Sequence, residues 1–261
     1  MARPSVLVSA HGGGAVRGPD PDGTRLALEQ AVALGVDYVE LDVRRSRDGV
    51  LLLCHDRELH VGGRLRAVAD VDADELADAI PGLLRLDEAL EVLTGRAGAH
   101  LDLKFRSPGS VHELAAATRS LDVLGPGEVL VTTSNPRAIR AIRDWSVARG
   151  RPLLTGLSIG GSVAGRPPLE QLRLRQGELF PADRFVESRA EAVVANHWLA
   201  LASLARFARR AGLPLVVWTV DHPVLLRYWM RPGRAWLVTT NRPERALAIR
   251  AGRNRSEAGA D

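Results

Sequence analysis

The chain has 261 residues, of which 46% are hydrophobic and 25% charged, a composition typical of one folded domain with a sizeable core. No run of about 18 apolar residues occurs, which excludes a membrane-spanning helix, and a single cysteine, Cys54, excludes an internal disulfide. The 35 basic residues are interleaved with 31 acidic ones, so the net charge of +4 forms no basic block and nucleic acid is not expected as a partner.

The predicted elements begin with the apolar stretch Ser5–Ala10, which is too short for a secretory signal and fits a first strand. We therefore expect a cytoplasmic protein without stable membrane insertion. Apolar runs and helical patterns then alternate along the chain. The further predicted strands cover Asp37–Arg44, Val50–Cys54, Ala99–Lys104, Glu128–Thr132, Pro152–Leu157, Ala192–Ala195, Pro214–Val220 and Ala235–Val238.

Segments with helical periodicity lie between most of these strands. The predicted helices cover Thr24–Leu34, Leu86–Thr94, Val111–Leu124, Pro136–Arg149, Leu199–Ala211 and 242–252. Repeated strand–helix alternation predicts a parallel sheet, and the number of repeats fits a single-domain (β/α)8 TIM barrel over residues 1–252. Residues 160–191, rich in Gly, Pro and Arg, are expected to form a loop or insertion, and residues 253–261 a disordered tail.

Polar residues recur at the ends of the first four predicted strands. In a parallel barrel these ends meet at one mouth, where catalytic groups are held. Residues i and i+2 of a strand share a face, so two pairs on neighbouring strands are expected to converge there. The residues concerned are His11, Glu40 with Asp42, His55, and Asp102 with Lys104.

Three carboxylates that converge in a partly buried mouth repel each other unless a cation balances them. The residues concerned, Glu40, Asp42 and Asp102, offer the oxygen ligands that Mg²⁺ or Ca²⁺ prefers, and Mn²⁺ is a further candidate. A zinc site fits less well, because no His-x3-5-His spacing occurs. We therefore expect one divalent cation at the mouth.

Two histidines beside such a cation suggest a general base and a general acid, although the sequence leaves open which is which. Lys104 is the only lysine among the 35 basic residues and offers a point positive charge suited to a phosphate oxygen. Together these residues describe phosphoryl-ester chemistry better than another reaction class.

Five ordered motifs span nearly the whole chain: "SAHGGG", "DYVELDVRRSRDGVLLLCHD", "HLDLKF", "VVWTVDHP" and "LVTTNRP". They resemble "AHRG", "D.VE.DV..T.DG..V..HD", "IEIK", "V.WTVN" and "ITDRP" of the glycerophosphodiester phosphodiesterase family, within the superfamily of phospholipase C-like phosphodiesterases. The resemblance implies a (β/α)8 barrel, a role in lipid metabolism, and metal-dependent hydrolysis of a small glycerophosphodiester to glycerol 3-phosphate and an alcohol. The roles it implies are catalysis for His11 and His55, metal binding for Glu40, Asp42 and Asp102, and substrate binding for Lys104 and Trp218.

Three departures from the family pattern bear on activity, one of which is Asp22-Gly23-Thr24 where Glu-Asn-Thr is usual. Gly12 stands where the family usually has an arginine that follows the first histidine and binds phosphate. Arg17 or Arg44 is a candidate to replace that positive charge. Asp102 stands where glutamate is usual and is shorter by one methylene group, about 1.5 Å. Two alternatives therefore stay open. One is a catalytically impaired member that binds a phosphorylated ligand. The other is a lipid-directed phosphodiesterase with a rim on residues 160–191, where Phe180 and Phe185 are the aromatic residues.

Overall fold

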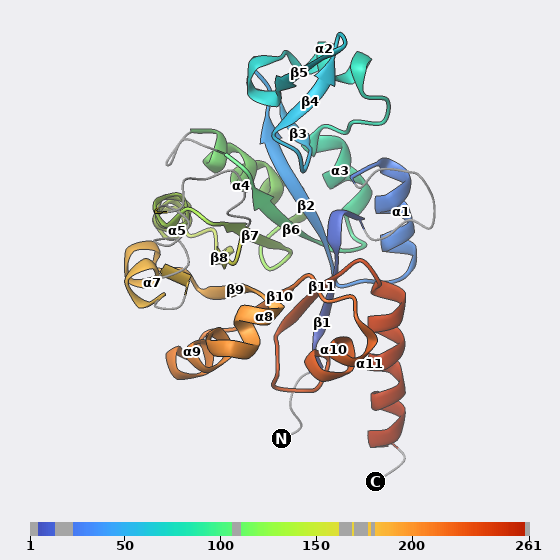
Figure 1. Ribbon diagram of the computed structural model, residues 1–261, viewed down its shortest axis with the longest axis vertical. Coiled ribbons are helices and arrows are strands. Elements are labelled where there is room, and N and C mark those ends of the chain that lie inside the picture. Colours follow the sequence, from blue (N-terminus) through green and yellow to red (C-terminus); the bar gives the residue numbers. More distant parts are fainter. Residues whose placement is uncertain are drawn as a thin grey trace.

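Eight parallel strands close into a barrel in the computed structural model, which describes residues 5–13, 23–105, 111–161, 169, 177–178 and 181–258. The ring closes because β1 pairs in parallel with both β11 and β2. The predicted (β/α)8 class is therefore confirmed (Figure 1). In order around the ring, the strands are β1 (Leu7–Ala10), β2 (Tyr38–Arg45), β6 (Gly98–Leu103), β7 (Val129–Thr133), β8 (Leu154–Ile159), β9 (Ala192–Asn196), β10 (Leu215–Trp218) and β11 (Leu237–Thr240).

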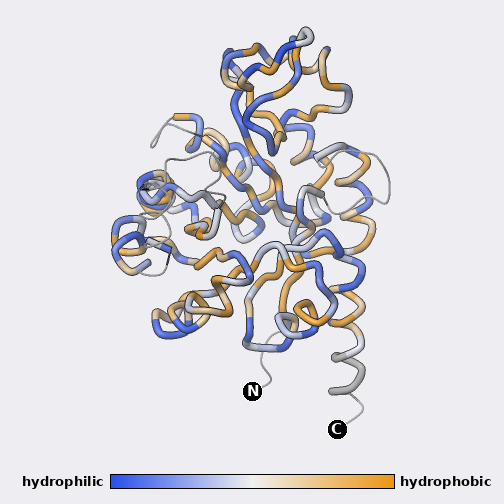
Figure 2. Tube along the Cα trace, viewed as in Figure 1, coloured by the Kyte–Doolittle hydropathy of each residue, from blue (hydrophilic) through white to orange (hydrophobic). Residues whose placement is uncertain are grey.

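Helices surround this barrel and cover the outward faces of its strands. Their starts follow from local capping: the Thr24 side chain accepts from the Ala27 amide at α1, and Asn135 caps α5 ahead of Pro136. In Figure 2 hydrophilic residues are frequent on the outer turns of α5, α7 and α9. The helices are α1 (Arg25–Ala33), α3 (Leu86–Leu93), α4 (Val111–Leu124), α5 (Pro136–Ala148), α7 (Ala182–Ser188), α8 (His197–Leu199), a π-helix (Ala200–Leu204), α9 (Ala205–Ala211), α10 (Pro223–Trp229) and α11 (Pro243–Ala258).

Side chains alternate along β2 between the helical layer and the barrel interior. Val39, Leu41 and Val43 are buried in the core between strands and helices. Tyr38 packs instead with apolar residues of other strands inside the barrel, and Gly98 leaves room for its ring, since a Cβ there would lie 2.6 Å from that ring. The interior is thus closed by apolar packing at one end, and the polar residues of β2 lie toward the other.

The joint between β1 and β2 is short. Only Ser9 with Tyr38 and Ala10 with Val39 are paired there among the described residues, against six paired positions between β2 and β6. The Asp37 carboxylate reinforces the joint, because it accepts from the Val8 amide at 2.7 Å and forms an ion pair with Arg250 in α11. The last helix is therefore tied to the place where the barrel closes.

A small subdomain follows β2. The sequence predicted its first strand, Val50–Cys54, as part of the parallel barrel, but this strand pairs antiparallel with β2 outside the ring, and the rest of the subdomain was missed. The subdomain has its own apolar cluster, formed by residues such as Leu52, Val61 and Leu76, and lies beyond the C-terminal end of β2 (Figure 1). Gly62 and Gly63 join its hairpin with φ angles of 59° and 75°, a glycine pair that is itself a hairpin signal. Its elements are β3 (Leu51–Leu53), β4 (Glu58–Val61), β5 (Arg64–Ala67), a 3-10 turn (Val68–Asp70) and α2 (Ala73–Ala79).

Two further segments are described in part. Helix α11 continues to Ala258, and residues 259–261 lie outside the described part. The segment 160–191 contains α7, whereas residues 162–168, 170–176 and 179–180 lie outside the described part. No helix of the described residues is long and apolar enough to cross a membrane.

Candidate active site

A cavity of about 300 Å³ opens at the carboxyl ends of the barrel strands. Its walls include residues from β2, β6, β7 and β10, from the turn after β1 and from the loop after β3. Every residue to which the sequence assigned a site role either lines this cavity or, for Asp42, stands next to one that does. The predicted site residues that line it are His11, Glu40, His55, Asp102, Lys104 and Trp218.

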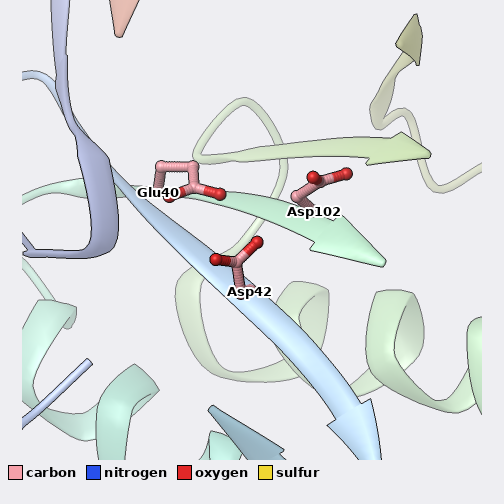
Figure 3. A group of neighbouring side chains, drawn as sticks. All are labelled: Glu40, Asp42 and Asp102. Atoms are coloured by element: carbon pink, nitrogen blue, oxygen red, sulfur yellow. The ribbon is translucent and has the colours of Figure 1, made fainter. Parts of the chain in front are cut away.

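Three carboxylates form an acidic cluster in this mouth. Glu40 and Asp42 come from β2 and Asp102 from β6, and one oxygen of each lies within 4.8 Å of those of the other two. The strand register explains the convergence, since Asp42 is paired directly with Asp102. Figure 3 shows the three carboxylates gathered on the same side of the two strands. The shorter Asp102 side chain therefore still reaches the cluster.

Glu40 is the most deeply buried member of the cluster, with 4% of its surface exposed. Burial raises the pKa of its carboxyl well above the ordinary value, and the charges of Asp42 and Asp102 raise it further. The Gly12 amide opposes this shift by donating to Glu40 Oε2 at 2.9 Å. Gly12 makes this approach with a φ of 55°, a left-handed conformation that glycine adopts readily.

Lys104 forms ion pairs with both aspartates of the cluster. Its Nζ lies 3.0 Å from Asp42 Oδ1 and 2.5 Å from Asp102 Oδ2. Burial lowers the pKa of this ammonium, but the carboxylates of Asp102 and Asp42 outweigh it and raise the pKa well above its ordinary value. The site thus already holds one cation against three acids, and its all-oxygen donor set fits a hard divalent ion.

His11 is held by a chain of hydrogen bonds that the sequence analysis missed. Its Nδ1 lies 2.8 Å from Asn241 Oδ1, and Asn241 Nδ2 donates to Asp221 Oδ2 at 2.8 Å. The bond to Asp221 orients the amide with its oxygen toward His11, so a neutral His11 donates from Nδ1 and keeps Nε2 as an acceptor. Both partners lie in motifs quoted from the sequence, Asp221 three residues after the end of β10 and Asn241 directly after β11, which was the available signal.

His55 sits on the exposed rim beside a carboxylate. Its Nδ1 is 3.0 Å from Asp56 Oδ1, and 68% of its side chain is exposed. The backbone at this position is anchored by Arg44, whose Nε and Nη2 donate to the His55 carbonyl at 3.1 and 2.7 Å. Arg44 Nη1 also donates to the Lys104 carbonyl at 3.2 Å, so one guanidinium joins the ends of β2 and β6 to the histidine loop.

His100 also lines the mouth but is a buried structural group. Its ring nitrogens lie 3.5 Å from Ser9 Oγ and 3.2 Å from Thr132 Oγ1. Burial, assisted by the charge of His11, lowers the pKa of His100 to about 3, so the ring is neutral. It therefore supports the acidic cluster without adding charge.

Trp218 lies at the end of β10 and lines the same cavity. Its buried Nε1 has no hydrogen-bond partner among the residues that the structure describes. Arg17 lies outside the described residues, as does Phe180. Phe185 is buried against Phe207, with ring centroids 5.0 Å apart, and therefore does not contribute an aromatic rim.

Comparison with known proteins agrees with this arrangement. Residues 11–245 match the Glycerophosphoryl diester phosphodiesterase family. A glycerophosphodiester phosphodiesterase of Bacillus altitudinis is 30% identical over 112 residues, which cover 38% of this chain and 45% of that protein. The chain thus aligns with less than half the length of this curated relative.

Solved structures share the fold at low sequence identity. A putative glycerophosphoryl diester phosphodiesterase of Agrobacterium tumefaciens has a TM-score of 0.75 at 18% identity, with 97% of this chain and 100% of that chain covered. An Oleispira antarctica phosphodiesterase in complex with the product sn-glycerol-3-phosphate has a TM-score of 0.68 at 20% identity, with coverages of 94% and 96%.

Proposed function

The chain belongs to the glycerophosphoryl diester phosphodiesterase family, and on that premise we propose that it hydrolyses glycerophosphodiesters to glycerol 3-phosphate and an alcohol. The observation that carries the proposal is the acidic cluster of Glu40, Asp42 and Asp102, set in a cavity whose rim carries two histidines. The product complex of the Oleispira antarctica phosphodiesterase supports the same substrate class.

Glu40, Asp42 and Asp102 would hold one divalent cation, Mg²⁺, Ca²⁺ or Mn²⁺. The raised pKa of Glu40 supports this role, because burial and then the charges of Asp42 and Asp102 disfavour its carboxylate, which a bound cation would stabilise. A bound cation would supply Lewis-acid polarisation of the phosphoryl oxygens and balance the charge of the acids.

The two histidines divide the proton transfers between them. His11 Nε2 is the free acceptor left by the Asn241 contact, which suits it to take the proton of the attacking hydroxyl, from the substrate's glycerol or from water. His55, beside Asp56, is suited to carry a proton and to donate it to the leaving alkoxide as its P–O bond breaks. This assignment gives the base role to the imidazole with a fixed tautomer.

Lys104 and Trp218 are assigned to the substrate. The Lys104 ammonium lies beside the carboxylates and lines the cavity, where it can stabilise charge on the phosphoryl oxygens. Trp218 offers an apolar face and an unpartnered donor to the glycerol part of the substrate.

The proposal is tested with purified protein, glycerophosphocholine and Mg²⁺, Ca²⁺ or Mn²⁺ supplied separately. We expect release of glycerol 3-phosphate and choline, lost in excess chelator and restored by added ion, as measured by enzymatic assay of glycerol 3-phosphate. If the substrate binds but is not turned over with each of these ions, the chain is the impaired, ligand-binding member. Release of phosphocholine instead would contradict the bond cleavage proposed.

Asn241→Ala is expected to reduce kcat by about 10- to 100-fold, part of the roughly 10²–10⁴ that a positioned proton-transfer group supplies. The reason is that His11 loses the acceptor that fixes its tautomer. The limb of the pH–kcat profile that reports the base should shift, which a loss of stability alone would not cause. The control is Asn135→Ala, which removes the cap of α5 and should lower the melting temperature while leaving that limb in place.

A further inference from the structure

A second cavity, of about 440 Å³, lies between the barrel mouth and the β3–α2 subdomain. Arg44, Lys104 and Phe105 line both this cavity and the active-site cavity, so the two adjoin along a shared wall. Its remaining walls come from β2, from the start of α4, from the loop before β4 and from residues 67–70 after β5. A substrate held at the acidic cluster therefore has a neighbouring space for one of its two halves.

This second cavity, which we call the basic cavity, is strongly positive. Arg44, Arg45 and Arg57 line it, and Asp70 is the only carboxylate among its described lining residues. Within the described part of the chain none of the three guanidinium groups forms an ion pair. A fourth cation, Lys104, is already neutralised by the acidic cluster.

Arginines elsewhere on the same subdomain form ion pairs. Arg47 pairs with Asp72, and Arg66 pairs with Glu75, so carboxylates are available on this surface. The lack of such partners is therefore local to the basic cavity. Three guanidinium groups thus face one cavity whose described lining holds a single carboxylate, that of Asp70, and an anion would balance the excess positive charge.

The donors of these arginines remain partly free. Arg44 donates three N–H groups to the backbone carbonyls of His55 and Lys104. Arg45 Nη1 donates to the Arg47 carbonyl at 3.4 Å. A guanidinium has five N–H groups, so both keep donors for a ligand, and Arg57 is exposed.

His112 completes the wall as a neutral group. Burial and the charge of Arg45 lower the pKa of its imidazole, which therefore adds a hydrogen-bonding group at pH 7 rather than charge. The positive charge of the cavity thus comes from the arginines.

We propose that the basic cavity binds an oxyanion on the leaving alcohol, so that the enzyme prefers glycerophosphodiesters whose alcohol carries a phosphate or phosphodiester group. The inference rests on the proposed function and names its substrate class. The glycerol phosphate half occupies the active-site cavity, and the alcohol extends across the shared wall. Guanidinium groups bind phosphate oxygens bidentately, whereas a choline or ethanolamine cation is repelled there.

The test compares three substrates that differ in the charge of the leaving alcohol: glycerophosphocholine, glycerophosphoglycerol and bis(glycerophospho)glycerol. The last two share the same scissile bond, and only the last has an anionic leaving alcohol. For the unmodified protein we expect kcat/KM to be at least about tenfold higher for the anionic substrate than for the neutral one, as charge-assisted hydrogen bonds provide. Glycerophosphocholine should be the poorest substrate, and added salt should reduce the preference.

In the double variant Arg45→Ala/Arg57→Ala, the ratio of kcat/KM between the anionic and neutral substrates should fall to about one. The ratio is independent of the fraction of active protein. Arg57→Ala alone, at an exposed position, should reduce it in part, which guards against a folding defect of the double variant. The control Arg210→Ala, on the exposed surface of α9, should keep the full ratio. A ratio near one in the unmodified protein, or a ratio unaffected by the double substitution, would overturn the proposal.

If none of the three diesters is hydrolysed, the proposed function fails and the cavity is tested by calorimetric binding of the same compounds. Tighter binding of bis(glycerophospho)glycerol than of glycerophosphoglycerol, lost in the double variant, would support the anion site. Equal binding of the two compounds, or no binding of either, would refute it.

Discussion

Glu40→Gln is expected to reduce turnover by about a thousandfold or more and, in the same protein, to raise the melting temperature of the metal-free form. The loss follows because the variant removes one of the three carboxylates proposed to hold the cation. Cation stabilisation of a phosphoryl transition state is worth several kcal/mol, and each 1.36 kcal/mol corresponds to a tenfold change in rate. The measurement is kcat with glycerophosphocholine at saturating divalent ion.

The gain in stability follows from the sign of the pKa shift. The pKa of Glu40 in the folded protein is raised above its ordinary value of 4.5, first by burial. Because the pKa of Glu40 is raised on folding, its protonated form stabilises the fold. This contribution is fully present at pH values below the ordinary pKa and is lost as the pH rises through the pKa of the folded protein. Glutamine keeps an acceptor for the Gly12 amide without the charge. The difference in melting temperature should therefore grow as pH rises above 4.5, by roughly 2–4 °C per kcal/mol.

Divalent ion should reverse the order of stability. If the cluster holds the ion as proposed, the unmodified protein should gain stability by binding it, whereas Glu40→Gln should gain little. The control is Glu58→Gln on the exposed strand β4, which should change neither turnover nor the response to the ion. If Glu40→Gln lost no activity, or if it melted lower than the unmodified protein without ion, the carboxylate would not be the buried cation ligand described above.

His11→Ala and His55→Ala are expected to reduce turnover of glycerophosphocholine by about 10²–10⁴-fold each, the usual contribution of a proton-transfer group. The two substitutions should differ in their effect on a substrate that has a better leaving group. A nitrophenolate departs without a proton, so His55→Ala should retain most activity toward bis(p-nitrophenyl) phosphate. His11→Ala should lose activity toward both substrates, because a base is still needed for attack.

The measurement is the ratio of kcat/KM for the two substrates in each variant. The opposite pattern, with His11→Ala rescued by the better leaving group, would exchange the roles of acid and base. Asp56→Asn provides a matched check, since it removes the charge beside His55 Nδ1 and should resemble a weak form of His55→Ala. Equal losses for both substrates in both variants would contradict a division of labour between the histidines.

The barrel and the acidic cluster could be predicted from the sequence because both depend on local periodicity. Alternation along β2 places Glu40 and Asp42 on one face, and the rule that strand ends share a mouth brings Asp102 to them. The fold places all three as expected. The pairing of Asp42 directly with Asp102 is a register between strands far apart in the chain, which no local pattern specifies.

Other features depend on tertiary contacts or on weak signals. The β4–β5 hairpin has short, mostly exposed strands without clear alternation, although Gly62-Gly63 was a usable turn signal. The Asp221–Asn241 chain that holds His11 joins residues from opposite ends of the sequence. The basic cavity likewise forms only when the hairpin folds over the end of β2, so no local pattern predicts that Arg57 lines one cavity with Arg44 and Arg45.

The short joint between β1 and β2, with two paired positions, lies beside the proposed catalytic residues. His11 follows one side of that joint and Glu40 stands on the other, and the Gly12–Glu40 hydrogen bond crosses it. The Asp37–Arg250 ion pair connects the final helix, α11, to the same joint. Substitutions near either end of the chain can therefore impair catalysis by separating β1 from β2, even where the substituted residue does not contact the substrate.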